Sequence, residues 1–462
     1  MDEIYGYQLA QRGPLAILDN SLVDPHPPLY YLIQWGLSAG GRLHSEWAWR
    51  WLPMLSGTLA VVCFYALAVR LSSLRAALLS GLLFALSPTL IYFSQEARAT
   101  SFVLFLTLVS MHLLRAIEEQ PDDKRLWGVY GTLLLVGLYC NHSFGLIVGV
   151  QLLYLLLIAR LGAPSLLLGV VLMLCYLPAL PVFLPVLMTV QGVVQQGPSA
   201  NLILIGQSLL GGDVLRYGIS WAHPWLLGLT VGLGGIGVAT GLREKRRFTW
   251  YLMLQLLLPL LIIFGVLRGG VGLSFPAHQS KLMVVLLPSL FLLVAQGIES
   301  LLRLRPPLIG RGLVVGIYLI LLFASAINIQ RYWEISKSPE AQAVLWMRAQ
   351  VRPRDVVISL HYSPDAALSF YMPALRPHPK PDAFPEGIVL FPLSHITPMK
   401  INQPVLTASP DMARSHPRIW LLDFDFARPE VKAMQDDLVQ GCTVTQEQRY
   451  PPFRVRLLEG CP

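Results

Sequence analysis

Long runs without a charged residue alternate with short polar segments from position 51 to about 330 of the chain. A helix that crosses a bilayer needs roughly 20 mostly apolar residues. Windows of this kind without Asp, Glu, Lys or Arg predict single spans at 51–69, 76–95, 99–114, 164–184, 222–242, 248–267, 282–298 and 312–330. The uncharged stretch 126–159 is too long for one span, and Cys140-Asn141-His142-Ser143 divides it into a hairpin. We therefore expect a polytopic α-helical membrane protein with about ten transmembrane helices.

The short loops between these spans predict an orientation, because loops that face the cytoplasm are enriched in Lys and Arg. One set of alternate loops is clearly basic and comprises 70–75, 115–125, Arg160, 243–247 and 303–311. The other set comprises 94–98, 140–143, 185–221 and 268–281 and has fewer basic residues. We expect the first set to be cytoplasmic, so the chain's first residues and its long C-terminal tail lie outside the cytoplasm.

The tail after the last span has an ordinary polar mixture and reads as a separate domain. Strand-like runs at 355–360, 387–391, 418–426 and 453–458 alternate with helical patterns at 338–350 and 428–440. This alternation predicts a small α/β domain. The expected division is an external first loop at 1–47, a transmembrane domain at 48–332 and a soluble extracytoplasmic domain at 333–462.

The first external segment contains a predicted helix of its own, HPPLYYLIQWGLSAGG at 26–41. Pro is favoured in the first turn of a helix and Gly just past its end. The segment is too short to span a bilayer and is rich in aromatic residues, so we expect it to lie at the outer interface. No hydrophobic segment precedes Asp2, and we expect that a first transmembrane helix is missing from the chain.

The composition supports a membrane protein, with 54% hydrophobic residues, 13% charged residues and a mean hydropathy of +0.55. Soluble proteins average about a quarter charged residues. The net charge of +8 is dispersed among short loops, which is typical of membrane orientation and argues against a nucleic acid partner.

The five cysteines show no metal-ligand spacing. We therefore expect no required cofactor, although a divalent metal is not excluded. Outside the cytoplasm, Cys442 and Cys461 either form a disulfide or stay unpaired.

Ionisable residues collect on the predicted outer side of the membrane domain. They are Asp2, Glu3, Asp24, His26, Glu96, Arg98, His142 and the stretch His278-Gln279-Ser280-Lys281. Such groups near membrane depth are costly and tend to be functional. Each also has a simpler explanation when taken singly: Asp2 and Glu3 as an exposed chain end, and Glu96 and Arg98 as a paired turn. Asp423 and Asp425 at a strand end fit ordinary strand-end polarity better than a site.

The ordered series of motifs is more specific than any one of them. DEIYGYQLAQ, HPPLYYLIQWGL, SEWAWRWLPMLSGTLAVVCFYALAVRL and LLFALSPTLIYFSQEARA follow one another along the chain. This series resembles the GT-C glycosyltransferases of family 39, which include protein O-mannosyltransferases and lipid A aminoarabinose transferases. The bacterial dolichyl-phosphate-mannose-protein mannosyltransferase-like group is the nearest in pattern. The resemblance covers positions 1 to about 370 and is densest in 1–160.

The chain departs from the family's pattern in two places. Family members normally have a transmembrane helix before the Asp-Glu motif. They also often have an Arg-Tyr pair where this chain has His278-Gln279-Ser280-Lys281. Lys281 and Arg268 are therefore only candidates for the anchor of the donor phosphate.

The resemblance implies an inverting transfer of a sugar from a polyprenyl-phosphate donor to an acceptor hydroxyl on the extracytoplasmic face of the cell membrane. By the motif match, Asp2 is the general base and Glu3 supports it or binds the acceptor. Glu96 orients Arg98 or binds a sugar hydroxyl. The candidates for the donor phosphate and sugar are His26, Arg98, His142, Arg268 and Lys281.

The acceptor stays open between a lipid, a polysaccharide and a protein. The alternatives to an enzyme of this kind are a lipid or polysaccharide transporter or flippase, and an inactive membrane scaffold. The polar residues gather at one face rather than at the midplane, and no internal repeat is visible, which argues against a transporter.

Overall fold

The computed structural model describes two compact parts of the chain. The described residues are 6–7, 9–10, 13–20, 27–40, 42–43, 45–180, 206–207, 209–210, 222–262, 283–334, 339–352, 355–359, 367–368, 371–372, 376–377, 389–392, 417–424, 429–451 and 453–461. One part comprises residues 12–335, and the other comprises residues 1–11 and 336–462. Each is a unit with its own contacts, and each is described here by itself.

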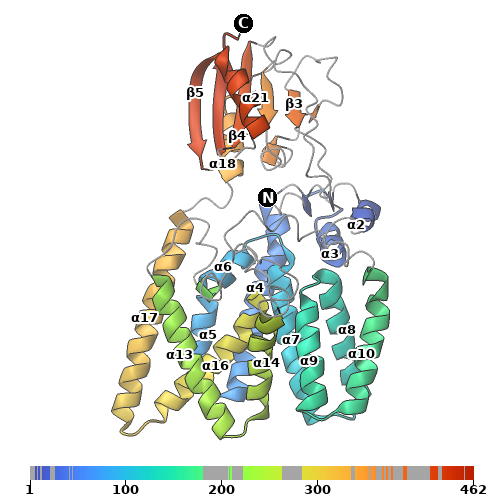
Figure 1. Cartoon of the computed structure of the whole chain (residues 1–462), viewed down its shortest axis with the longest axis vertical. Coiled ribbons are helices and arrows are strands. Elements are labelled where there is room, and N and C mark those ends of the chain that lie inside the picture. The colour runs from blue at the N-terminus through green and yellow to red at the C-terminus, as the bar shows by residue number, and fades with distance from the viewer. Residues whose placement is uncertain are drawn as a thin grey trace. The chain divides into compact units, whose positions relative to one another are not determined.

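The unit formed by residues 12–335 is a bundle of helices (Figure 1). Its helices are α2 (Pro14–Asn20), α3 (Leu29–Leu37), α4 (Glu46–Leu71), α5 (Leu74–Ala85), α6 (Pro88–Ser94), α7 (Ala99–Glu119), α8 (Lys124–Cys140), α9 (Phe144–Leu157), α10 (Gly162–Tyr176), η1 (Leu177–Ala179), α13 (Ala222–Arg243), α14 (Arg247–Leu261), α16 (Leu287–Leu302) and α17 (Pro307–Glu334). Each predicted span coincides with one of these helices or with the bent pair α5–α6, so the multi-pass membrane architecture is confirmed.

The number of full-length spans among the described residues is smaller than the ten expected. Six helices are long and apolar enough to cross a membrane, and the pair α5–α6, bent by 55°, makes a seventh if it counts as one span. The predicted hairpin at 126–159 forms α8 and α9, which have 17 and 14 residues. The span predicted at 248–267 appears as α14, with 15 residues. At 1.5 Å per residue α8 and α9 reach about 21–26 Å, short of the roughly 30 Å hydrocarbon core. Residues 263–267 of the window that contains α14 lie outside the described residues.

Local sequence signals set where several helices begin. The side chains of Ser45, Ser73 and Asp123 accept backbone N–H bonds at the starts of α4, α5 and α8, as N-cap residues commonly do. The break between α5 and α6 falls at Pro88, which has no N–H to continue the α5 ladder. The bend therefore follows from the sequence Ser87-Pro88.

The short helix expected at 26–41 is α3, which follows Pro28 and ends before Gly40, whose φ is +73°. The side chain of Gln34 in α3 donates to the carbonyl oxygen of Trp49 in α4 at 2.7 Å. This bond fixes the short helix to the first long one.

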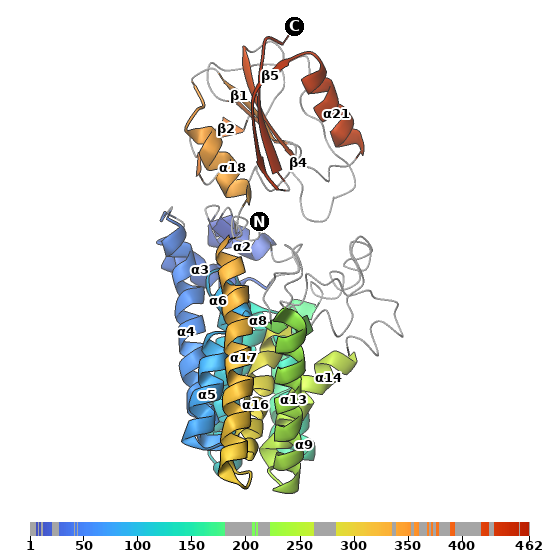
Figure 2. The same ribbon diagram turned by 90° about the vertical axis from the view of Figure 1, so that its left-hand side faces the viewer.

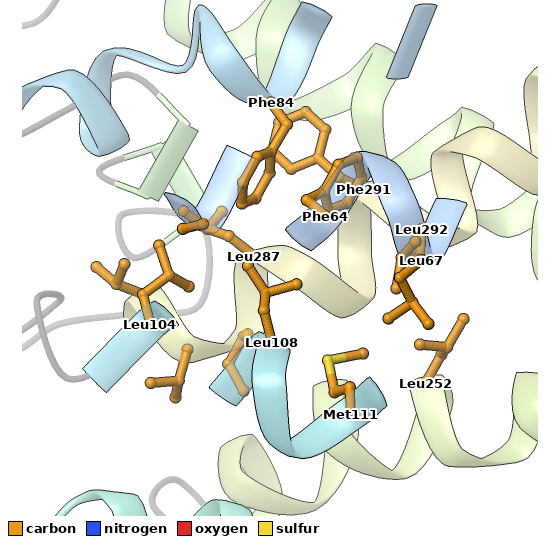
Figure 3. Packing of buried hydrophobic residues seen from close by; sticks show 14 of the residues in the cluster. Phe64, Leu67, Phe84, Leu104, Leu108, Met111, Leu252, Leu287, Phe291 and Leu292 are labelled. Carbon is orange, nitrogen blue, oxygen red and sulfur yellow. The ribbon is translucent and has the colours of Figure 1, made fainter. Parts of the chain in front are cut away.

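Helix α16 occupies the centre of the bundle, with 89% of its apolar window buried. Phe64 of α4 and Phe84 of α5 stack with ring centroids 4.2 Å apart, and Phe291 of α16 meets both edge-on (Figure 3). Leu104, Leu108 and Met111 of α7 belong to the same core.

Helices α13 and α16 approach so closely that only glycine fits at their contact. A Cβ at Gly237 would lie 1.9 Å from the carbonyl oxygen of Leu293, and one at Gly297 would lie 2.0 Å from that of Leu233. Close backbone approach at small residues is a common way for membrane helices to pack.

Because successive helices alternate in direction, the polar segments form two ends of the bundle (Figures 1 and 2). One end holds the basic loops and an ion-pair cluster. In this cluster, Arg303 pairs with Glu244 at 2.8 Å and with Glu299 at 2.5 Å, and Arg246 also contacts both carboxylates. The turns at 95–98 and 141–143 lie at the other end. The sequence predicts that the basic end faces the cytoplasm.

The second unit contains a six-stranded sheet in the order β2-β3-β1-β4-β6-β5. Its elements are α18 (Pro339–Arg348), β1 (Val356–Ser359), β2 (Arg376–Pro377), β3 (Val389–Pro392), β4 (Arg418–Phe424), α21 (Pro429–Gln440), β5 (Thr443–Tyr450) and β6 (Phe453–Glu459). Strands β1–β4 pair in parallel, whereas β6 pairs antiparallel with β4 and β5. The helices α18 and α21 lie on opposite faces of the sheet (Figure 2). The expected α/β domain is confirmed, and the sequence missed β2 and β5.

A buried carboxylate and a disulfide stabilise this unit. Buried Asp355, just before β1, accepts a bond from Trp420 Nε1 at 2.8 Å and pairs with Arg418 Nε at 3.1 Å, which joins the starts of β1 and β4. Cys442 and Cys461 are joined by a disulfide beside the apolar core under α21. Asp423, one of the acids noted at a strand end, is buried and paired with Arg456 of β6.

Candidate functional site

The segment that joins α6 to α7 brings two of the predicted site residues together. It comprises Gln95, Glu96, Ala97 and Arg98, and we call it the charged turn. The side chains of Glu96 and Arg98 are only 13% and 21% exposed, and Arg98 Nε lies 3.8 Å from Glu96 Oε2. Its backbone is tight, since Arg98 N donates to the carbonyl oxygen of Glu96 at 2.7 Å. The turn therefore holds an opposite-charge pair in a largely desolvated position.

The charged turn is positioned by close packing of α6 on α4. A Cβ at Gly57 of α4 would lie 2.0 Å from Ser94 Oγ. Ser94 is the last residue of α6, and its hydroxyl donates to the carbonyl oxygen of Leu90 at 2.6 Å. Any larger residue at position 57 would therefore displace the helix end from which the turn starts.

The last described helix of the bundle also contacts the charged turn. The hydroxyl of Tyr332, near the end of α17, donates to Gln95 Oε1 at 2.9 Å. The ring of Tyr332 also meets that of Tyr92 in α6, with centroids 5.6 Å apart. Residues 237 positions apart in the sequence thus share one small polar contact.

The predicted site residue His142 lies at the same end of the bundle, in the turn between α8 and α9. Its Nδ1 is hydrogen-bonded to the hydroxyl of Tyr176, at the end of α10. Asn141 Oδ1 accepts from both the backbone N–H and the hydroxyl of Ser143, which closes the turn. His142 is therefore held by α10 in a defined direction.

Five predicted site residues lie outside the described residues, namely Asp2, Glu3, His26, Arg268 and Lys281. Their roles stay predictions. The structure places Glu96 and Arg98 together in one turn, and it places His142 in a separate turn at the same end.

Sequence analysis missed Gln95, Tyr176 and Tyr332. Gln95 adjoins the Glu96–Arg98 motif, so its position gave a signal. The sequence held no signal for Tyr332, because Tyr is common near the ends of membrane spans whether or not it belongs to a site.

No three or more His, Cys, Asp or Glu side chains come close enough to hold a metal ion within the described part of the chain. The expectation that no metal is required rests on the sequence. Among the described candidates, Arg98 is the cation suited to bind a phosphate, because guanidinium forks onto two oxygens.

The apolar helical bundle and the sheet unit together have the GT-C membrane fold. ArnT from Cupriavidus metallidurans bound to undecaprenyl phosphate matches with a TM-score of 0.57 and 12% identity over 99% of this chain and 93% of that one. The apo form of the same protein matches with a TM-score of 0.56 and 11% identity over 98% and 93%. The archaeal oligosaccharyltransferase AglB from Archaeoglobus fulgidus, in complex with an inhibitory peptide and a dolichol-phosphate, matches with a TM-score of 0.50 and 10% identity over 81% and 59%.

A family model agrees with this fold over part of the chain. Residues 25–188 match the model described as dolichyl-phosphate-mannose-protein mannosyltransferase. No curated protein matches the sequence. The resemblance to GT-C glycosyltransferases is thereby confirmed, and the family match and the fold together indicate a membrane glycosyltransferase.

Proposed function

We propose that the protein is an inverting glycosyltransferase that moves a sugar from a polyprenyl-phosphate donor to an acceptor hydroxyl on the extracytoplasmic face of the cell membrane. The observation that supports it most is the match along 99% of the chain to the fold of ArnT, which was solved bound to undecaprenyl phosphate. The match of residues 25–188 to a family of dolichyl-phosphate-mannose transferases points to the same donor class.

The donor's lipid tail stays in the bilayer while its phosphosugar head reaches the membrane surface. The reacting carbon therefore belongs at one end of the bundle rather than in its middle. The charged turn and His142 lie at such an end, and the basic loops lie at the opposite one. The positive-inside rule makes the end with the charged turn extracytoplasmic.

Arg98 binds the donor phosphate in this proposal. Negative charge grows on the phosphate as the bond to the anomeric carbon breaks, so a fixed cation stabilises the transition state more than the ground state. Burial strengthens this effect, because the field of a charge is less screened away from water. Glu96, 3.8 Å from Arg98 Nε, orients the guanidinium or accepts a bond from a sugar hydroxyl.

Asp2 acts as the general base that takes the proton from the acceptor hydroxyl, and Glu3 holds Asp2 or the acceptor. A positioned base of this kind typically contributes about 10²- to 10⁴-fold to the rate. His26, Lys281 and Arg268 are further candidates for contacts to the phosphate and sugar. His142, bonded to Tyr176 through Nδ1, is another candidate for a contact to the donor. With a single phosphate to neutralise, this reaction does not need a metal.

The test uses the purified protein with a panel of radiolabelled polyprenyl-phosphate sugars and nucleotide sugars. We expect transfer from one polyprenyl-phosphate sugar, with inversion at the anomeric carbon, and a loss of about 10²-fold or more in Asp2→Asn. The matched control is Asp19→Asn, which alters an exposed carboxylate of the same external segment. Transfer from a nucleotide sugar alone would overturn the proposed donor class. Full activity in Asp2→Asn would remove Asp2 as the base.

A further inference from the structure

The charged turn is short, and its direction depends on what holds it from outside. It follows the last residue of α6, Ser94, and α7 begins at Ala99. Its own backbone bonds are local: Gln95 N donates to the carbonyl oxygen of Tyr92, and Glu96 N to that of Phe93. Local bonds of this kind fix the shape of the turn but do not fix where it points relative to the rest of the bundle.

Contacts from two other helices meet the two residues just before Glu96. Helix α4 packs so closely on Ser94 that no side chain fits at Gly57. The hydroxyl of Tyr332 in α17 donates to Gln95 Oε1 at 2.9 Å, and its ring packs on Tyr92. Ser94 and Gln95 are thereby fixed to α4 and α17, so the backbone that follows enters Glu96 and Arg98 in one defined direction.

We propose that Tyr332 is a positioning residue for sugar transfer, acting through Gln95 to aim Arg98 at the donor phosphate. The inference rests on the proposed function. A phosphate-binding guanidinium stabilises the transition state only if it is held in place before the reaction, and a misplacement of about 1 Å can cost 10²-fold in rate. Tyr332 supplies this constraint from the last described helix of the bundle without touching the reacting atoms.

The same helix offers a matched control. Tyr318 also lies in α17, and its buried hydroxyl has no hydrogen-bond partner among the described residues. Tyr332→Phe and Tyr318→Phe therefore remove the same atom from the same helix. One substitution breaks the bond to Gln95, and the other breaks no bond of this kind.

The first measurement is steady-state transfer with a polyprenyl-phosphate sugar. We expect Tyr332→Phe to lower kcat by about tenfold or more, with KM for the acceptor unchanged, and Tyr318→Phe to behave as the wild type. In an Arg98→Gln background, Tyr332→Phe should change kcat by less than about twofold, because residues that act through one another are not additive. An undiminished effect of Tyr332→Phe in that background, or an equal effect of Tyr318→Phe, would overturn the proposal.

The second measurement does not depend on activity. Hydrogen–deuterium exchange of the amides at 95–98 should be faster in Tyr332→Phe than in the wild type, and unchanged in Tyr318→Phe. Equal exchange in all three proteins would refute the positioning role. A wild type that transfers no sugar, yet shows this difference in exchange, would contradict the proposed function while leaving the positioning of the turn intact.

Discussion

At the scale of single residues, a polar side chain at a strand end is explained by its neighbours as much as by its type. Asp423 is 4% exposed, lies near the end of β4 and is paired with Arg456 of the adjacent strand. Burial raises the pKa of Asp423 above its usual value, although Arg456 and Arg454 oppose the shift. The sequence favoured ordinary strand-end polarity at this position, and the ion pair agrees with that interpretation.

The shifted pKa of Asp423 predicts a pH dependence of stability. A carboxyl with a raised pKa in the folded state binds its proton more tightly there than in the unfolded chain. Its contribution is therefore full below the unfolded pKa of about 3.9 and is lost as the pH rises through the folded value. We expect the melting temperature of the wild type, relative to Asp423→Asn, to fall as the pH rises above about 4. A difference that grows with pH would mean that the ion pair with Arg456 outweighs burial.

Some residues of the candidate site could be predicted from the sequence, and others could not. Glu96 and Arg98 were predicted from a short motif, and adjacency in sequence guarantees that they lie close in space. Tyr332 was out of reach, because its partner Gln95 is 237 positions away. Such a pairing depends on the order in which helices pack, which hydrophobic periodicity does not encode.

At the scale of elements, apolar windows located the helices well but did not set the lengths of α8 and α9. The uncharged stretch 126–159 included residues that the structure places in the turn between these two helices. Strand β5 was missed because its sequence TVTQEQRY is polar, and nearly all of its residues are exposed. Without one buried face, a strand shows no alternation of apolar and polar residues.

The close packing of α13 on α16 predicts unequal effects of two similar substitutions. Gly237→Ala places a methyl group 1.9 Å from the carbonyl oxygen of Leu293, whereas the Cβ of Gly235→Ala meets nothing within 4 Å. We expect Gly237→Ala to destabilise the bundle by about 1–3 kcal/mol, as overpacking does. Thermal unfolding in detergent measures this, with Gly235→Ala as the control. Equal melting temperatures for the two variants would contradict the packing described here.

The disulfide in the sheet unit predicts a loss of stability on its removal. Cys442 and Cys461 are 19 positions apart, and closing a loop of this size stabilises a domain by about 3 kcal/mol in the chain-entropy account. The double variant Cys442→Ser with Cys461→Ser should therefore show faster hydrogen exchange in β5 and β6. Cys175→Ser, at an exposed free cysteine, should not. Unchanged exchange in the double variant would show that the sheet is stable without this bond.

At the scale of the whole molecule, charge is unequally divided between the two ends of the bundle. The basic loops and the Arg246, Glu244, Arg303 and Glu299 cluster lie at one end, and the charged turn lies at the other. The multi-pass architecture was predictable from apolar length and loop charge, which follow from the bilayer itself. The GT-C fold was implied by the resemblance of the ordered motifs to that superfamily. The constraints on the charged turn were not predictable, since they arise from contacts between helices distant in sequence.

The central claim is that the donor phosphate binds at the charged turn through Arg98. The most direct test measures the dissociation constant of undecaprenyl phosphate for the protein in lipid nanodiscs, comparing Arg98→Gln with Arg331→Gln, which alters an exposed cation near the end of α17. A hydrogen bond to a charged group contributes about 1.5–3 kcal/mol, so Arg98→Gln should bind about 10- to 100-fold more weakly. Arg331→Gln should bind as the wild type does. Wild-type affinity in Arg98→Gln would contradict the account.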